Sequence, residues 1–351
     1  MQFRRQSLTA YAAPLCETVA DLPEPEGTQV LVRVARCGVC HSDVHLQDGY
    51  FSMGQDRRLD ITAGRKLPFT LGHEIAGVIA RSGPEARDLA DGQAVAVYPW
   101  IGCGACPVCA RGDEILCNAP RQLGITVDGG FATHVLVPHP RYLLDYAPIP
   151  TAVAAAYMCS GLTAYSALKK LTDRARRGPL LLIGAGGVGM MGLAFARAMF
   201  AHPPIVADID PAKRAAALAA GATAVVDPAQ AAARKQVAAL TEGGAVGAVD
   251  FVGSDRSLTF AAGALAKGGK VVVAGLLGGA FSTPVPTFPL KVVTIEGTFV
   301  GTLAEAHEML ALARAGKVPP VPITERPLTA AQASLDDLRN GRIVGRVVLS
   351  P

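Results

Sequence analysis

The sequence predicts an α/β protein in which a mainly β part is followed by a doubly wound parallel sheet. Two observations support this fold class. Between about residues 29 and 140, short runs place apolar residues at every second position, which is typical of half-buried strands. From about residue 151, compact apolar runs alternate with alanine-rich helical segments, which indicates strands that are buried on both faces of a sheet.

The mainly β part contains four clear strand patterns, each bounded by Gly, Pro, Asp or Ser. They lie at 29–35, 74–80, 93–98 and 131–137. Between the first two, the polar segment 50–68 predicts a long loop, either surface decoration or one that shapes the entrance to a site.

The second part begins with a helical pattern at 152–171 and continues as alternating strands and helices. Its strands are expected at 179–186, 204–210, 223–227, 247–253 and 270–276. Later, Leu303, Ala306, Leu310 and Ala313 share one helical face, and Gly316 provides a stop. The chain closes with a predicted strand within 341–351.

Size and composition point to a globular protein with two domains. The length of 351 residues exceeds the usual size of one hydrophobic core, and 50% of the residues are apolar. The formal charge is +4, and the basic residues form short clusters such as Arg174, Arg176 and Arg177. Such clusters are usually solvated surface, so we expect no nucleic-acid partner.

The chain shows no pattern of export or membrane insertion. Its first residues lack the sustained apolar run of a signal peptide, and no segment approaches the length of a membrane span. We therefore expect a cytoplasmic protein without a membrane partner. In that reducing compartment its cysteines should be thiols or thiolates.

A glycine-rich turn marks a candidate dinucleotide site. Gly184, Gly186 and Gly189 fit G-x-G-x-x-G directly after a predicted strand and before a helix, and Gly187 and Val188 complete the turn. The glycines permit close approach of a pyrophosphate, which the helix N-terminus favours. A turn that only packs a helix on a sheet is the alternative.

Asp208 ends the next predicted strand, where a carboxylate can accept hydrogen bonds from the adenosine ribose. An acid there repels a 2′-phosphate, which favours NAD over NADP. Asp227 is an acid of similar placement. Asp210 precedes Pro211 and is interpreted as the cap of the following helix.

Four cysteines are crowded into one short segment: Cys103, Cys106, Cys109 and Cys117. Four thiolates can close a tetrahedral cage around zinc, and a closed cage is a structural site because it leaves no position for substrate. A redox-active C-x-x-C pair is the alternative.

A second set of metal-binding residue types is widely spaced along the chain, at Cys40, His73, Glu74 and Cys159. On spacing alone, packed core residues are the more expected interpretation of this set.

Five motifs taken together favour metal ligands over packed core residues for this set. They are CHSDVH at 40–45, GHE at 72–74, the cysteine segment 103–117, Cys159 and the glycine-rich turn. In this order they resemble the zinc-containing medium-chain alcohol dehydrogenase family across nearly the whole chain. The resemblance implies a GroES-like, mainly β catalytic domain at 1–150, an inserted Rossmann NAD-binding domain at 151–300, and a segment at 301–351 that completes the catalytic domain.

The resemblance also implies two zinc ions per chain, one catalytic and one structural. Cys40, His73 and Cys159 are implied as ligands of the catalytic zinc, with Glu74 a nearby carboxylate that binds the metal transiently. Asp43 resembles the acid that holds the ligand histidine in the required tautomer. Cys16 and Cys37 match no ligand position, and we expect both to be buried small apolar residues.

The activity implied is the NAD-dependent oxidation of an alcohol to an aldehyde or ketone. A proton would leave through Ser42 and the cofactor ribose to His45. By the same resemblance His41 and Arg346 face the cofactor pyrophosphate, and Lys213 lies near the adenosine ribose.

Ser42 stands where many relatives carry threonine, which leaves room for larger, aromatic or secondary alcohols. Trp100, the only tryptophan, either lines the substrate pocket or belongs to the core. Two other functions are weighed: an NADPH-dependent quinone or enoyl reductase, which lacks the zinc ligands, and a non-catalytic zinc and NAD redox sensor. Family members form dimers and tetramers, so a homo-oligomer is expected.

Overall fold

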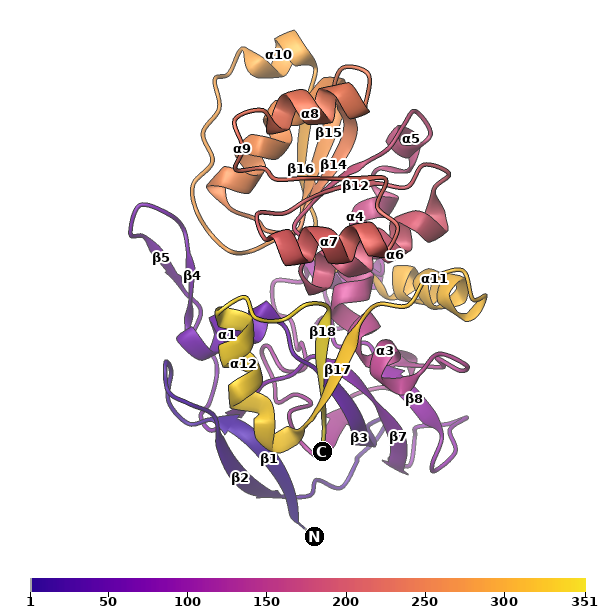
Figure 1. The fold of residues 1–351 in the computed structure, drawn as a ribbon. Helices are drawn as coiled ribbons and strands as arrows, with labels where there is room; N and C mark the ends of the chain where they lie inside the picture. The colour runs from indigo at the N-terminus through magenta and orange to yellow at the C-terminus, as the bar shows by residue number, and fades with distance from the viewer. Residues whose placement is uncertain (1) are drawn as a thin grey trace.

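The computed structural model describes residues 2–351, which fold around two large sheets (Figure 1). One is a parallel sheet in the order β13-β12-β11-β14-β15-β16. Chain order therefore reverses between β11 and β14, which is where open α/β sheets bind their ligands. The strands are β11 (Leu181–Ile183), β12 (Ile205–Ala207), β13 (Ala224–Val226), β14 (Ala245–Asp250), β15 (Leu265–Val273) and β16 (Thr294–Gly297).

Helices connect these strands, and local sequence signals set their ends. Asp210 caps one helix by accepting hydrogen bonds from the backbone N–H groups of Ala212 and Lys213, as its position before Pro211 predicts. The helices of this part are α4 (Leu162–Lys169), α5 (Thr172–Ala175), α6 (Gly187–Met199), α7 (Pro211–Ala219), α8 (Ala233–Leu240), α9 (Asp255–Ala264), α10 (Thr287–Lys291) and α11 (Leu303–Arg314).

The mainly β part contains a second large sheet, in the order β10-β8-β7-β3-β18-β17, with β9 also paired to β3. Its strands are β3 (Val30–Gly38), β7 (Glu74–Ser82), β8 (Ala94–Val97), β9 (His134–Val137), β10 (Leu143–Leu144), β17 (Ile323–Pro327) and β18 (Arg346–Ser350). A smaller sheet joins β1 (Gln2–Leu8), β2 (Cys16–Asp21) and β6 (Phe69–Thr70).

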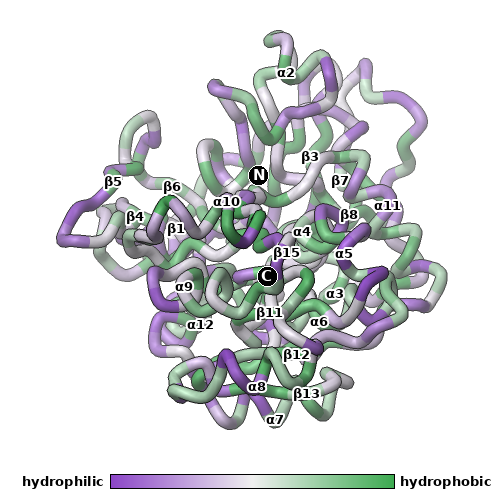
Figure 2. The backbone as a smooth tube through the Cα atoms, turned by 90° about the horizontal axis from the view of Figure 1, so that it is seen from above, coloured by the Kyte–Doolittle hydropathy of each residue, from purple (hydrophilic) through white to green (hydrophobic). Residues whose placement is uncertain are grey.

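The end of the chain returns to its beginning. β18 pairs antiparallel with β3, so the last strand, drawn in yellow, lies beside the indigo strands of the first part (Figure 1). The remaining helices of this part are α1 (His41–Asp48), α2 (Pro107–Ala110), α3 (Thr151–Ala156) and α12 (Ala331–Arg339). Figure 2 shows α2 at one extremity of the molecule.

One helical segment joins the two large sheets. α3 contacts β3 and β7, a π-helical turn follows at Tyr157–Gly161, and α4 then contacts α6. Isolated π-helical turns often occur at functional sites because they redirect side chains within a helix. Here the turn carries Cys159.

Two expectations from the sequence are wrong. Cys16 is exposed because it begins β2, which pairs only with β1 at the edge of the small sheet, whereas Cys37 is buried as predicted. The segment 50–68 is not only loop, because it contains an antiparallel hairpin of β4 (Tyr50–Ser52) and β5 (Arg58–Asp60). The tip of this hairpin packs closely on the parallel-sheet part: a Cβ on Gly54 would lie 2.7 Å from the backbone nitrogen of Ala280.

Within residues 2–351, none of the helices has the length and apolar character that crossing a bilayer requires.

Candidate active site

Three buried side chains from distant segments meet between the two sheets. Cys40 lies at the start of α1, His73 directly precedes β7, and Cys159 lies in the π-helical turn. The Sγ atoms of Cys40 and Cys159 are 4.0 Å apart. One ligand atom from each of the three residues lies within 4.8 Å of the others.

The donor set of this group fits a zinc ion. The Nε2 of His73 is buried and makes no hydrogen bond to any residue of the described chain. A buried polar atom in that state needs a partner, and two thiolates with one imidazole are ligands that zinc prefers. A hydrogen bond with Cys159 lowers the pKa of the Cys40 thiol, which favours the thiolate that a metal requires. Three protein ligands would leave one of the four positions that zinc prefers free for another ligand.

Asp43 contacts two segments of this group and so fixes its geometry. Its Oδ1 lies 3.3 Å from His73 Nδ1, so Nε2 is the nitrogen left for a metal. The same carboxylate accepts backbone hydrogen bonds from Cys40 at 2.9 Å and Gly72 at 3.3 Å. Asp43 therefore ties the cysteine segment to the histidine segment.

Glu74 is buried beside the group but lies outside it. Its Oε1 accepts hydrogen bonds from Arg346 and, at 3.3 Å, from the backbone N–H of Ser160. Its Oε2 has no partner in the part of the chain that the structure describes. Burial raises the pKa of Glu74 to about 7, although Arg346 acts in the opposite direction. Transient metal binding by Glu74 stays a prediction.

Helix α1 places three polar side chains near the group. His41 is exposed and Ser42 and His45 are partly exposed. Desolvation lowers the pKa of His45, and His41 lowers it further. Desolvation also lowers the pKa of His41, and the positive charges of Arg346 and Lys213 lower it further. Arg346 and Lys213 are thus each close enough to His41 to act on its charge.

The glycine-rich turn leaves open space at its second glycine. Gly184 has φ +92°, a value that side chains disfavour, and a Cβ on Gly189 would lie 1.8 Å from the carbonyl oxygen of Gly184. A Cβ on Gly186 would meet no described atom within 4 Å, so this glycine faces open space. The first and third glycines therefore serve the fold, and the second leaves room for a ligand.

Arg346 lies against the same turn. A Cβ on Gly187 would lie 2.8 Å from Arg346 Nη1, so the start of α6 and this guanidinium are adjacent. Asp208 is held at the end of β12, where its carboxylate accepts hydrogen bonds from the backbone N–H groups of Ala185 at 2.7 Å and Asp210 at 2.8 Å. The predicted cofactor residues thus gather at one end of β11 and β12.

The four cysteines of the short segment also meet. Sγ–Sγ distances are 3.9 Å for Cys103 and Cys109, 3.4 Å for Cys106 and Cys109, and 3.9 Å for Cys106 and Cys117. A disulfide would need about 2 Å. Zinc–sulfur bonds of about 2.3 Å in a tetrahedron place sulfurs about 3.8 Å apart, so the four thiols fit a zinc cage. Backbone N–H groups lower the pKa of Cys103 to about 6.

A buried acid that the sequence analysis missed supports this cage. Glu114 accepts hydrogen bonds from the backbone N–H of Gly102 at 2.8 Å and from the Tyr142 hydroxyl at 2.7 Å. Arg141 pairs with its other oxygen at 2.9 Å. Glu114 therefore anchors the cysteine segment to the rest of the fold.

Trp100 is buried beside the first group. Its Nε1 donates to the Met158 carbonyl at 2.8 Å, and its ring centroid lies 5.3 Å from that of His73 and 5.5 Å from that of Phe299. Trp100 is therefore part of the core next to a predicted ligand, and a contact with substrate stays a prediction.

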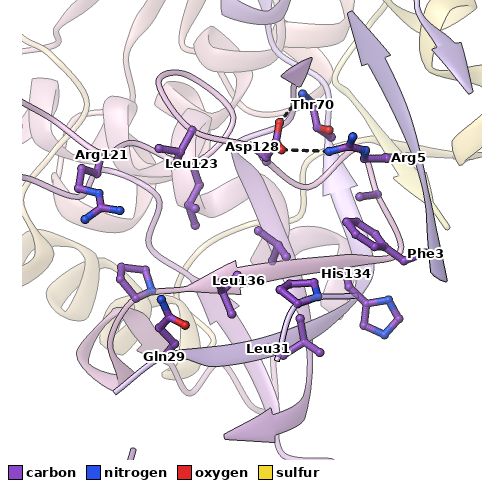
Figure 3. A pocket seen from close by; sticks show the side chains of 16 residues that line it. Phe3, Arg5, Gln29, Leu31, Thr70, Arg121, Leu123, Asp128, His134 and Leu136 are labelled. Carbon is purple, nitrogen blue, oxygen red and sulfur yellow. Dashed lines mark hydrogen bonds and ion pairs between the residues drawn. The ribbon is translucent and has the colours of Figure 1, made fainter. Parts of the chain in front are cut away.

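A separate cavity of about 300 Å³ lies elsewhere in the mainly β part (Figure 3). Phe3, Leu31 and Leu136 line it, and Arg5 pairs with Asp128 across it at 3.0 Å. The cavity contains none of the residues that we assign to the metal group or the cofactor turn.

Comparisons with known proteins agree with this geometry. Residues 26–149 match the alcohol dehydrogenase GroES-like domain, and residues 187–315 match the zinc-binding dehydrogenase domain. The chain is 38% identical to an NAD-dependent alcohol dehydrogenase of Sulfurisphaera tokodaii, with 99% of this chain and 100% of that protein covered. It is 37% identical to one from Saccharolobus solfataricus, with the same coverage. The solved alcohol dehydrogenase of Aeropyrum pernix superposes with a TM-score of 0.89 at 32% identity, covering 99% and 100% of the two chains.

Proposed function

Because the chain belongs to the zinc-containing medium-chain alcohol dehydrogenase family, we propose that it oxidises a primary or secondary alcohol to an aldehyde or ketone and reduces NAD. One observation carries this proposal. A buried group of Cys40, His73 and Cys159, with an imidazole nitrogen free to bind a metal, lies next to a dinucleotide turn to which Arg346 connects it.

Cys40, His73 and Cys159 would hold the catalytic zinc, and the four clustered cysteines would hold a structural zinc. When bound, the catalytic zinc is a Lewis acid that lowers the pKa of an alcohol, and NAD accepts the hydride. Asp43 orients His73 through the contact at Nδ1. The Arg346–Glu74 pair keeps a buried carboxylate close to the metal group without adding net charge.

The chain's own residues move the proton. The hydroxyl of Ser42, near the start of α1, would receive the proton of the alcohol. His45, which is partly exposed, would take up that proton and release it to solvent. The lowered pKa of His45 keeps its imidazole neutral at pH 7, so it is ready to accept.

The cofactor residues divide into two kinds. Gly184, Gly186, Gly187, Val188 and Gly189 form the turn for the pyrophosphate, at the N-terminus of α6. The cationic side chain of Arg346, together with His41, would lie on the other side of that anion. Asp208 would accept hydrogen bonds from the adenosine ribose with Lys213 nearby, which favours NAD over NADP.

Secondary and larger alcohols, aromatic ones included, are the proposed substrates. The small Ser42 leaves space beside the reacting carbon. Trp100 would supply an apolar wall next to His73. The hairpin β4–β5, which packs near Ala280, would close the outer end of the pocket.

We propose that residues 1–150 and 301–351 form the catalytic domain and that 151–300 form the NAD-binding domain. The pairing of β18 with β3 supports the first assignment.

We also propose a homodimer or homotetramer. β16 is an edge strand, and Val285, Leu290 and Val292 expose apolar side chains just before it. None of the eight cysteines, all of which lie within the described residues, forms a disulfide, and this favours a cytoplasmic location.

The test is NADH formation over a panel of primary, secondary, aromatic and polyol substrates, with NAD and NADP compared. Cys40→Ala should abolish turnover and lose one zinc per chain while NADH still binds. Cys37→Ala is the matched control, since Cys37 is equally buried but outside the metal group. Normal turnover in Cys40→Ala, or no oxidation of any alcohol by the parent protein, would contradict the proposal.

A further inference from the structure

A second hollow, unrelated to the proposed active site, is lined almost entirely by cations. It is an open depression with a volume of about 470 Å³, and it is lined by Lys170, Asp173, Arg174, Arg176, Arg177 and Lys270. Five of these six side chains are basic. They come from the end of α4, from α5 with the turn after it, and from β15.

The hollow lies at the amino-terminal edge of the parallel sheet. Lys270 of β15 pairs in register with Gly247 of β14. The residue after Gly247 in β14, Ala248, pairs with Leu181, the first residue of β11. The glycine-rich turn follows the last residue of β11, at the opposite edge. Figure 1 likewise places α5 far from α1. A ligand in this hollow would therefore not occupy the cofactor site.

The two lysines are already neutralised in part. Lys170 Nζ lies 2.7 Å from Glu296 Oε1, and Lys270 Nζ lies 2.5 Å from Glu296 Oε2. These two cations lower the pKa of Glu296, so its carboxylate is ionised at neutral pH. Glu296 thus holds both ammonium groups in place.

The three arginines, unlike the two lysines, form no ion pair with a carboxylate of the described chain. Within residues 2–351, none of the guanidinium groups of Arg174, Arg176 and Arg177 lies within ion-pair distance of a carboxylate. Arg176 and Arg177 are exposed, and Arg174 is half-buried. Three cations within four residues repel one another, and an anion placed between them would relieve that repulsion.

We propose that this hollow binds a compact polyanion with at least two adjacent phosphate groups. Guanidinium groups recognise phosphate oxygens through paired hydrogen bonds, and three arginines line this hollow together with two lysines that Glu296 holds in place. The volume lies within the range of about 300–1,000 Å³ that is usual for small-molecule sites. The arginines are the affinity-determining side chains, because the lysines keep Glu296 as their partner.

Binding is tested by calorimetric titration of inorganic triphosphate, and in a second arm ATP, into the zinc-loaded protein at low ionic strength. Saturating NADH is present throughout, so that the cofactor site is filled. We expect one triphosphate per chain, with affinity that falls as salt is added. Arg176→Gln with Arg177→Gln should weaken binding at least about ten-fold, because each removes charge-assisted hydrogen bonds. Tighter binding of ATP than of triphosphate would identify a nucleotide as the source of the phosphates, and equal binding an inorganic one.

The matched control is Arg87→Gln with Lys235→Gln, which removes the same charge from two exposed positions away from the hollow. This control should bind triphosphate like the parent protein and, like the arginine variant, keep its zinc content and melting temperature. If triphosphate removed zinc from the protein, it would do so equally in the arginine variant and in the control variant, so zinc loss cannot explain a difference between them. Absence of binding in the presence of NADH, or equal weakening in the two double variants, would overturn the proposal.

Discussion

Arg346 forms a buried ion pair with Glu74 and lies on its other side against Gly187, so one guanidinium joins the metal group to the dinucleotide turn. Arg346 begins β18, the strand that brings the end of the chain back to β3. The pairing of the last strand therefore decides whether the two halves of the site are assembled.

Replacing this arginine should cost stability and cofactor affinity together. Arg346→Gln would leave the Glu74 carboxylate buried without its cation, which typically lowers the free energy of unfolding by about 3–5 kcal/mol. NADH should also bind more weakly. Urea unfolding and fluorescence titration with NADH measure the two effects.

The control is Arg342→Gln, which removes a surface pair with Asp337. Exposed pairs contribute about 0–1 kcal/mol, so this variant should remain close to the parent protein. Equal stability of the Arg346 and Arg342 variants would rule out the structural role of the buried pair.

The cysteine cage should stabilise the protein without taking part in turnover. Cys109→Ser is expected to reduce the zinc content from about two to about one per chain, because a structural site needs all four ligands. The melting temperature should fall, while alcohol oxidation well below that temperature continues. Metal analysis with thermal unfolding checks this.

Cys16→Ser provides the comparison, since Cys16 is an exposed thiol outside both groups. It should keep both zinc ions and the parental melting temperature. If Cys109→Ser also retained two zinc ions, the cage would not be a metal site.

Sequence patterns predicted the features that depend on a few adjacent residues. The alternation of strands and helices, the glycine-rich turn and the Asp210 cap are local, and the structure confirms them. The family resemblance and fold class are confirmed by the matched domains and the similar structures.

Other features depend on contacts between distant segments. Glu74 and Arg346 are 272 positions apart, and neither residue indicates its partner. Cys16 was expected to be buried because cysteine usually is, but the exposure of an edge-strand residue depends on which strands pair. In the hairpin β4–β5, β5 is fully exposed and β4 has only three residues, so neither strand is long enough to show the buried apolar alternation by which strands are recognised.

Asp208 should decide between the two nicotinamide cofactors. Asp208→Gly removes the carboxylate at the end of β12, and with it the repulsion of a 2′-phosphate. The ratio of kcat/KM for NAD to that for NADP should fall at least about ten-fold, since one charge-assisted contact is lost. Asp210→Gly, two residues away at the helix cap, should leave the ratio unchanged. An identical ratio in the Asp208 variant would remove its proposed role.

His45 should set the acid limb of the pH profile. Because desolvation and His41 lower its pKa below the ordinary 6.5, the midpoint of the decline in alcohol oxidation should lie below pH 6.5. The free energy of unfolding should depend on pH in the same direction. Neutral His45 contributes fully to folding stability above pH 6.5, and this contribution is lost as the pH falls through the lowered pKa.

His45→Gln should lower kcat by about ten- to a hundred-fold and remove this limb, with partial rescue by small buffer bases. The measurement is kcat against pH in several buffers. An unchanged profile would exclude His45 from the proton path.

We propose that Cys40, His73 and Cys159 bind one zinc while the four clustered cysteines bind another. An anomalous difference map at the zinc edge, from crystals of the protein grown with NADH, tests it directly. We predict two peaks per chain, one bonded to the two sulfurs and the His73 Nε2 and one inside the cage. A map with no peak among Cys40, His73 and Cys159, in protein that oxidises alcohols, would contradict the account.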